Sequence, residues 1–235
     1  MSKEMFPDES AAPLAQKLLD EGNISRGVSK TNAVLANTYR LLSLTLLFSG
    51  AVAGVSAMLK LPHPGIIITL VGYFGLLYLT SRLRSSSWGL LSVFALTGFM
   101  GYTLGPIITH YLSMPSGSII VTTAFTITAV TFVGLSFYAR TTQRSFIGIG
   151  NFLIVGIVTA FLLGLAAILF SMPALAVAVS GLFVLLMAGL ILFETQNILK
   201  GGETNYIMAT ITLYVAIFNL FTSFLHLLGA FGGDE

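Results

Sequence analysis

The sequence has no cysteine and very few charged side chains. Without cysteine, the 235-residue chain can form no disulfide, no thiolate metal site and no cysteine nucleophile. Charged residues make up only 9% of the chain, against about 25% in an ordinary globular protein. Apolar residues make up 55%, so a soluble fold would expose more apolar surface than water tolerates. These deficits exclude most soluble folds and predict a protein whose solvent is lipid.

Motifs for catalysis are also missing. The chain has no H-E-x-x-H, no G-x-S-x-G and no pair of intramembrane aspartates. Gly201-Gly202 falls in an expected loop, without the strand-to-helix context that phosphate binding requires. The formal net charge is only +2 and the basic residues are dispersed, which argues against nucleic-acid binding. We therefore expect no enzyme, no metal site, no cofactor and no nucleic-acid partner.

The chain does contain seven long apolar runs. A bilayer core of about 30 Å needs roughly 20 apolar residues in a helix. Runs of this kind cover residues 39–59, 65–81, 87–112, 117–139, 146–170, 173–198 and 206–231. The loops between them are short, so consecutive helices should be antiparallel neighbours in one bundle. The sequence predicts an all-α membrane protein whose transmembrane domain covers residues 33–235.

The basic residues indicate an orientation, because positive charge collects in cytoplasmic loops. With the amino terminus in the cytoplasm, ten of the eleven basic residues fall inside and only Lys60 falls outside. The ten are Lys3, Lys17, Arg26, Lys30, Arg40, Arg82, Arg84, Arg140, Arg144 and Lys200. An odd number of spans then places the carboxyl terminus outside, in the periplasm.

Residues 1–32 precede the first span and contain no apolar core, so they are not a cleavable signal. Pro7, Pro13, Gly22 and Gly27, together with mixed charge, favour a mostly irregular and flexible cytoplasmic tail. At most one or two amphipathic turns are expected over residues 14–19. The tail is either a solvated leader that helps topology or a handle that another protein grips.

Glu194 is the only acidic residue within a predicted span. It precedes Lys200 by six residues, which places it about 9 Å above the next loop. Arg40 and Arg82, at inner helix ends, are its candidate charge partners. Glu194 is then either an interfacial carboxylate paired with one of these arginines, or a group that senses protons or coordinates a cation such as calcium.

Glycine recurs at helical spacing within residues 87–112. Gly98, Gly101 and Gly105 place no side chain on one helix face, where a neighbouring helix can approach closely. Pro106 removes a backbone hydrogen bond and should kink or break this helix. The glycine face is either a packing surface or the hinge of a moving helix.

The other polar residues of the spans carry weaker signals. The threonines within residues 117–139 should bond the carbonyl of the preceding turn, with a hydrated path as the alternative. His63, His110 and His226 fall at or near the outer side, where scattered histidines carry no assignment. Asn219 is the candidate polar residue within residues 206–231.

Several strings together are typical of one family. They are NTY at 37–39, LSLTL at 42–46, GFMGYTLGP at 98–106, FETQNI at 193–198, GETNYI at 202–207, LY at 213–214 and FNLF at 218–221. Over residues 30–231 the chain resembles the Bax-inhibitor (TMBIM) family and, within it, the bacterial YccA-type inner-membrane proteins.

The resemblance implies a seven-helix bundle whose last helix is central and surrounded by the other six. Some members of the family are pH-sensitive calcium leak channels, in which one carboxylate of the sixth span and one of the seventh form a proton-sensing pair. Glu194 matches the first position, but the second falls on Ala216, which cannot titrate. YccA-type members are instead associated with the membrane AAA+ protease FtsH, as a substrate and modulator.

These observations lead to three hypotheses. The favoured one is a multi-pass bacterial inner-membrane protein that binds an FtsH-type protease and modulates it as a slow competing substrate, through its N-terminal tail. The alternative is a pH-sensitive calcium or cation leak channel with Glu194 as the proton sensor. The third is a structural membrane protein that packs with a complex.

Overall fold

The computed structural model describes the backbone of residues 11–232, with the side chains of residue 27 and of residues 29–232. This part of the chain contains no strand. Its helices are α1 (Ala11–Met58), α2 (Ile66–Leu83), α3 (Trp88–Leu112), α4 (Gly117–Thr141), the short η1 (Ile147–Ile149), α5 (Gly150–Leu169), α6 (Pro173–Leu199) and α7 (Tyr206–Gly232). Seven helices are long and apolar enough to cross a membrane. The prediction of an all-α seven-helix membrane protein is confirmed.

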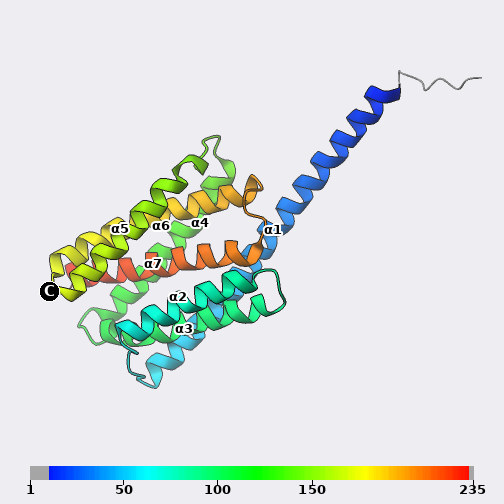
Figure 1. Ribbon diagram of the computed structural model, residues 1–235. Helices are drawn as coiled ribbons and strands as arrows, with labels where there is room; N and C mark the ends of the chain where they lie inside the picture. The colour runs from blue at the N-terminus through cyan, green and yellow to red at the C-terminus, as the bar shows by residue number, and fades with distance from the viewer. Residues whose placement is uncertain (1–10, 233–235) are drawn as a thin grey trace, which may run out of the picture.

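The first helix begins earlier than the first apolar run. α1 starts at Ala11, so residues 11–32 are helical where mostly irregular chain is expected, and residues 1–10 lie outside the described part. Starting a helix is costly, but extending one adds a hydrogen bond for each residue fixed. The membrane span thus acts as a nucleus from which the helix continues towards the amino terminus. Figure 1 shows this first part of α1 extending beyond the rest of the bundle.

The last helix lies in the middle of the bundle. α7 packs against α1, α3, α4 and α6, whereas α2 packs against α3 and α5 against α6. Figure 1 shows α7 between α2 and α3 on one side and α5 and α6 on the other, with α4 crossing it. Buried residues run along α7 from Ile207 to Leu225, while Thr80 is the only buried residue of α2. The expected central position of the seventh helix is confirmed, with α2 and α5 as an outer row.

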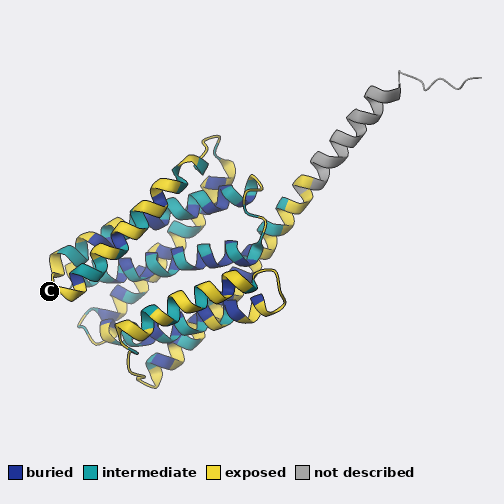
Figure 2. Ribbon diagram, viewed as in Figure 1, coloured by how far each residue is buried: buried dark blue, intermediate teal, exposed yellow. Residues whose placement is uncertain are grey.

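The outer surface of the bundle is apolar. Large apolar side chains of α2, α4 and α5 are exposed, for example Ile67, Phe137 and Phe152. Figure 2 shows exposed residues along the outer sides of these helices and intermediate or buried residues on the sides that face the bundle. Exposed apolar surface of this extent is unfavourable in water and suits contact with lipid acyl chains.

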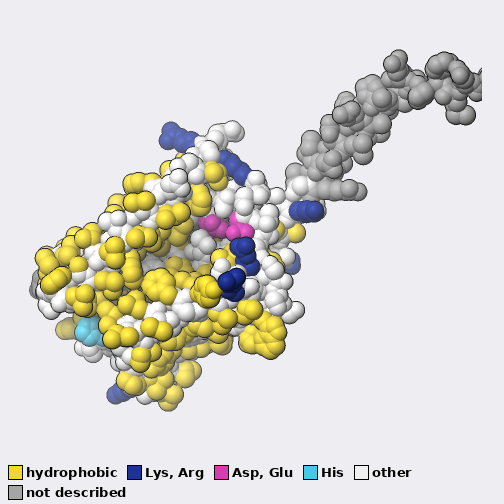
Figure 3. Space-filling view, in the orientation of Figure 1, with side chains coloured by type: hydrophobic (Ala, Val, Ile, Leu, Met, Phe, Trp, Pro, Cys, Tyr) yellow, Lys and Arg dark blue, Asp and Glu magenta, His cyan; other side chains and the backbone are white. Residues whose placement is uncertain are grey.

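The charged side chains lie at the ends of the bundle. Among the described basic residues, Lys60 lies alone in the turn between α1 and α2, whereas Arg82, Arg84, Arg140, Arg144 and Lys200 lie in or beside loops at the opposite end. Figure 3 shows most Lys and Arg side chains of the visible face gathered at the end from which α1 extends. That distribution follows the positive-inside pattern. The cytoplasmic position of the amino terminus stays a prediction.

The glycine face of α3 is a packing surface against α1. A Cβ added at Gly101 would overlap the carbonyl oxygen of Ser49, and one added at Gly105 would overlap the side chain of Ser56. At Gly98 a Cβ would come within 2.9 Å of the Phe48 ring. The backbones of α1 and α3 therefore approach more closely than a side chain on this face permits.

Pro106 does not break α3, which continues to Leu112. Proline has no backbone N–H, so the carbonyl of Tyr102, four residues earlier, loses its helical donor. Ser56 of α1 replaces that donor, because its hydroxyl donates to the Tyr102 carbonyl oxygen at 3.0 Å. The expected break is wrong, since a side chain of the neighbouring helix satisfies the freed carbonyl.

Replacing Ser56 tests this compensation. Ser56→Ala keeps the Cβ that packs on Gly105 but leaves the Tyr102 carbonyl unpaired, so we expect a loss of about 1–3 kcal/mol in the free energy of unfolding. In a Pro106→Ala background the restored N–H pairs with the same carbonyl, and Ser56→Ala should cost less. Unfolding of the four proteins of this cycle by SDS titration in detergent micelles measures the difference. An equal cost in both backgrounds contradicts the compensation.

The glycine face gives a second test. Gly101→Ala forces α3 away from the Ser49 carbonyl, and overpacking of this kind costs about 1–3 kcal/mol of stability. The matched control is Gly134→Ala in α4, where an added Cβ has no neighbour within 4 Å. That variant should be neutral or more stable by up to about 1 kcal/mol, because alanine favours helix. The same SDS titration compares them, and similar stabilities of the two variants would exclude close packing as the role of this face.

Candidate functional site

Glu194 lies in the last two turns of α6, at the end of the bundle where the basic loops gather. Its side chain is only 4% exposed, and Ile191 and Ile198, one turn before and one turn after it, are fully buried. The carboxylate therefore belongs to the face of α6 that packs into the core. Its Oε1 atom is buried and has no hydrogen-bond partner among the described residues. A carboxylate held this way has an open position for a proton or a cation.

The two arginines expected to pair with Glu194 lie on the surface. Arg40 and Arg82 are both exposed. Arg82 donates from Nε to the hydroxyl of Tyr78 at 3.0 Å, and its guanidinium lies 5.5 Å from the centre of the same ring. Within the described residues neither arginine forms a hydrogen bond to Glu194, so the structure does not bring the three residues together.

A different arginine, Arg140, is connected to this end of α6 by contacts with the aromatic ring of Tyr39. The guanidinium of Arg140, at the end of α4, lies 4.8 Å from the centre of the Tyr39 ring in α1. The Tyr39 hydroxyl in turn lies 3.5 Å from Oγ1 of Thr195, next to Glu194 in sequence. A cation over an aromatic face is a favourable contact. Together these contacts link α1, α4 and α6 at one level of the bundle.

Gln196 holds the loop between α4 and α5 against α6. Its Oε1 accepts from the backbone N–H of Phe146 at 2.7 Å, and its Nε2 donates to the carbonyl of Arg144 at 2.7 Å. Lys200 adds a bond from Nζ to the Ser145 hydroxyl at 2.6 Å. Loop backbone groups near lipid need such partners, because an unpaired one is costly.

Asn205 ties the loop before α7 to the loop between α2 and α3. Its Oδ1 accepts from the N–H groups of Ile207 and Met208, which caps the first turn of α7. Its Nδ2 donates to the carbonyl of Arg84 at 3.0 Å, and its own N–H donates to Glu203 Oε1 at 2.7 Å. All three loops at this end are therefore hydrogen-bonded to one another or to α6.

Ala216 lies in an apolar part of the core. It is fully buried in one cluster with Met187, Ile191 and Leu220. This position offers Glu194 no second carboxylate. Among the described residues, no three histidine, cysteine or acidic side chains are grouped so that they could hold a metal ion.

The remaining candidates lie deeper in the bundle. Asn219 donates from Nδ2 to the carbonyl of Val215 and lines a cavity on the opposite half of α7. Tyr214 is fully buried, and its hydroxyl lies 2.6 Å from the Ser49 hydroxyl and donates to the carbonyl of Thr97 at 3.3 Å. One tyrosine thus connects α7 with α1 and α3.

The sequence alone does not predict the contacts of most of these residues, but it does predict the role of one of them. Arg140, Tyr214 and Gln196 bond to residues between 50 and 165 positions away or stack on distant rings, so no local pattern reveals them. Asn205 directly precedes an apolar run, and asparagine at that position is a recognised helix cap. That signal is sufficient to predict its role.

Comparison with known proteins places the chain in a family. Residues 31–233 match the family model described as inhibitor of apoptosis-promoting Bax1. The chain is 48% identical over 199 residues to the Escherichia coli K12 protein called modulator of FtsH protease YccA, which covers 85% of this chain and 90% of that one. It is 48% identical over 206 residues to an uncharacterized protein of Pseudomonas aeruginosa, covering 88% and 93%. A membrane protein of Vibrio cholerae is 37% identical over 207 residues, covering 88% and 93%.

The match to the family model covers all seven membrane-long helices, and the relatives are matched over nine tenths of their length or more. This chain belongs to the Bax inhibitor family.

Proposed function

We propose that this protein is a bacterial inner-membrane protein that binds an FtsH-type AAA+ protease and modulates it as a slow competing substrate. The observation that carries the proposal is the 48% identity, over 85% of the chain, to a protein named modulator of FtsH protease YccA. A second relative with the same identity is named inner membrane protein YccA. The seven apolar helices fit such a location.

The N-terminal segment is the proposed contact with the protease. The family model begins at residue 31, so the segment before it is not part of the shared bundle. α1 runs without interruption from Ala11 into the first membrane span, which connects this segment directly to the bundle. A AAA+ protease that pulls on the segment therefore pulls on α1.

The packing of α1 supports slow extraction. α1 is held to α3 by the close approach at Gly101 and Gly105, and by the bond from Ser56 to Tyr102. It is held to α7 through the pair of hydroxyls at Ser49 and Tyr214. Removing α1 from lipid breaks these contacts before any other helix is released. A client that engages readily and unfolds slowly occupies the protease and protects other substrates.

Deletion of residues 2–26 tests the role of the segment. We expect association with the protease to fall and the half-life of the protein in cells to rise, because the engagement point is gone. The measurements are co-purification from native membranes and a chase after synthesis is stopped. A matched variant replaces the same residues with a Gly/Ser linker of equal length, which separates a need for length from a need for sequence. Unchanged association and half-life in the deletion would refute the contact.

The orphaned carboxylate of Glu194 favours a second candidate function, a pH-sensitive cation leak. A buried carboxylate with an unpaired oxygen is expensive in a membrane protein and marks ion or proton pathways in many of them. The apolar surroundings of Ala216 weigh against the paired-carboxylate form of this mechanism. In this second proposal Glu194 alone binds the proton or the cation.

Flux through reconstituted vesicles separates the two functions. If Glu194 senses protons, the wild-type protein should pass calcium or protons at a rate that changes between acidic and neutral pH. Glu194→Gln keeps the shape of the side chain but cannot titrate, so it should remove that pH dependence. Ala216→Ser, a small change in the core cluster that contains Ile191, serves as the control for altered packing. Flux equal to that of empty vesicles at every pH would eliminate the leak.

A further inference from the structure

A second site lies in the other half of the bundle, away from Glu194. A cavity of about 440 Å³ lies between the outer helices α2 and α5, with α6 and α7 behind it. Its volume is within the range of small-molecule sites in proteins, about 300–1,000 Å³. α2 packs against α3 and α5 against α6, so the two outer helices meet here through side chains. Phe74 and Phe161, whose ring centres are 5.6 Å apart, form such a contact.

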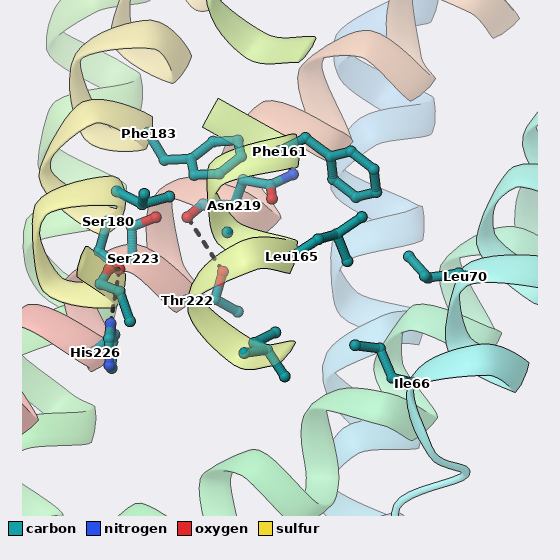
Figure 4. Close-up of a pocket in the computed structure, with 14 residues that line it drawn as sticks. Ile66, Leu70, Phe161, Leu165, Ser180, Phe183, Asn219, Thr222, Ser223 and His226 are labelled. Carbon is teal, nitrogen blue, oxygen red and sulfur yellow. Dashed lines mark hydrogen bonds between the residues drawn. The ribbon is translucent and has the colours of Figure 1, made fainter. Parts of the chain in front are cut away.

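The walls of the cavity are hydrocarbon and its back is polar. Ile66 and Leu70 of α2 face Phe161 and Leu165 of α5, while α7 contributes four polar residues and α6 contributes one. The polar residues are Ser180, Asn219, Thr222, Ser223 and His226. Figure 4 shows Asn219 and Thr222 in the middle of the lining, with Ile66 and Leu70 on one side and Ser180, Ser223 and His226 on the other.

The polar residues of α7 form one row. Positions 219, 222, 223 and 226 follow the spacing of a single helix face. They extend over about 10 Å, from the middle of α7 towards its end. A row of polar groups opposite hydrocarbon walls is the pattern of a site for a molecule with one polar and one apolar part.

Several atoms of the row have hydrogen-bonding capacity left over. Ser180 Oγ lies 2.7 Å from Nδ1 of His226 and 3.0 Å from the carbonyl oxygen of Ala176. Nε2 of His226 has no partner among the described residues, and it carries the ring hydrogen in the tautomer in which Nδ1 accepts from the Ser180 hydroxyl. Nδ2 of Asn219 donates one of its two hydrogens to the Val215 carbonyl and keeps the other, and Oγ of Ser223 has no partner among the described residues. An imidazole, an amide and a hydroxyl can thus donate hydrogen bonds to a ligand head.

The chemistry of the row selects the kind of head. None of its groups carries a permanent charge, and Lys60 is the only described basic residue with an ammonium or guanidinium group at this end of the bundle. Phosphate and sulfate heads need cationic donors, which this cavity lacks. A neutral carbonyl accepts from the donors present here without bringing a charge into the bilayer.

We propose that this cavity binds a neutral, carbonyl-headed amphiphile that enters from the lipid between α2 and α5. The polar head lies along Asn219, Ser223 and His226, which supply the donors, and the hydrocarbon part lies along Leu70, Phe161 and Leu165. Two sources share this chemistry, the ester carbonyl of an acyl lipid and the ring carbonyl of a quinone. Neither the protease contact nor the leak requires this site.

Binding to the purified protein in detergent tests the proposal. The probes are methyl oleate for the acyl source, decylubiquinone for the quinone source and hexadecane for the tail alone, each titrated as a mole fraction in the micelle. Saturable thermal stabilisation gives the affinity. We expect at least one carbonyl probe to bind, with the preferred probe identifying the source, and hexadecane to bind at least tenfold more weakly.

Four variants assign the binding to this cavity. Gly164 lines it, and a Cβ there makes only ordinary contact with Val179 at 3.6 Å, so Gly164→Leu fills the space without a backbone clash and should abolish binding. His226→Phe and Asn219→Leu should each weaken binding about tenfold, the value of one hydrogen bond. His226→Gln keeps a hydrogen-bonding group and should restore much of the affinity.

The matched control is His110→Phe, which removes an exposed histidine from the same half of the bundle and should bind like wild type. Gel filtration and circular dichroism of the unliganded proteins verify that each variant is folded. If Gly164→Leu does not fold, His226→Phe and Asn219→Leu are sufficient to test whether binding occurs in this cavity. No saturable binding by wild type, wild-type affinity in Gly164→Leu, or equal binding of hexadecane would each overturn the proposal.

Discussion

The structure depends on one constraint: in lipid, every backbone N–H and carbonyl must find a partner within the protein. Helices satisfy it along most of the chain, and the exceptions are met by side chains. Ser56 supplies the donor that Pro106 lacks, Gln196 serves the loop before α5, and Asn205 caps α7 while it bonds the carbonyl of Arg84. The polar residues of the bundle are therefore mostly structural. Thr122, Thr126 and Thr128 follow the same rule, because each bonds the carbonyl of the preceding turn as the sequence predicts.

Against this background, polar atoms without a partner are informative. Glu194 is buried near the basic end of the bundle with one free oxygen, and the row from Asn219 to His226 lines a cavity towards the other end. They differ in chemistry. Glu194 carries an ionisable acid in a core that holds no second carboxylate at Ala216, which suits a proton or a cation. The row is neutral and opens towards lipid, which suits a ligand that dissolves there. Besides the buried hydroxyl of Ser136, the described part of the bundle thus has two separate places where polar groups lack a partner within the protein.

The fold was largely predictable from sequence, and the sites only in part. Long apolar runs separated by charge, proline and glycine define helices because lipid admits few alternatives. The sequence does not predict the early start of α1 at Ala11, because proline and glycine in this region weigh against helix in isolation. A helix that has already formed, however, extends at little cost.

The burial of Glu194 follows from its position in an apolar run. The absence of a bond from Glu194 to Arg40 or Arg82 cannot be predicted in this way, because pairing depends on how each helix is rotated about its axis. The sequence assigns no role to His226 for the same reason, because its bond to Ser180 joins α6 to α7 across 46 residues.

The arrangement of α1 connects the shared fold with the proposed contact to a protease. One helix contains both the segment that precedes the family match and the span that packs on α3 and α7. A force applied to the first residues is transmitted along a continuous helix, and it meets resistance where α1 lies closest to its neighbours, at Ser49 and Ser56. Those contacts lie within the membrane-length part of α1, away from the end of the bundle at which α1 enters it. In the proposed function, engagement and extraction are then separate steps that depend on different residues. A protein built this way can be a readily bound but slowly degraded client without any catalytic or inhibitory group directed at the protease.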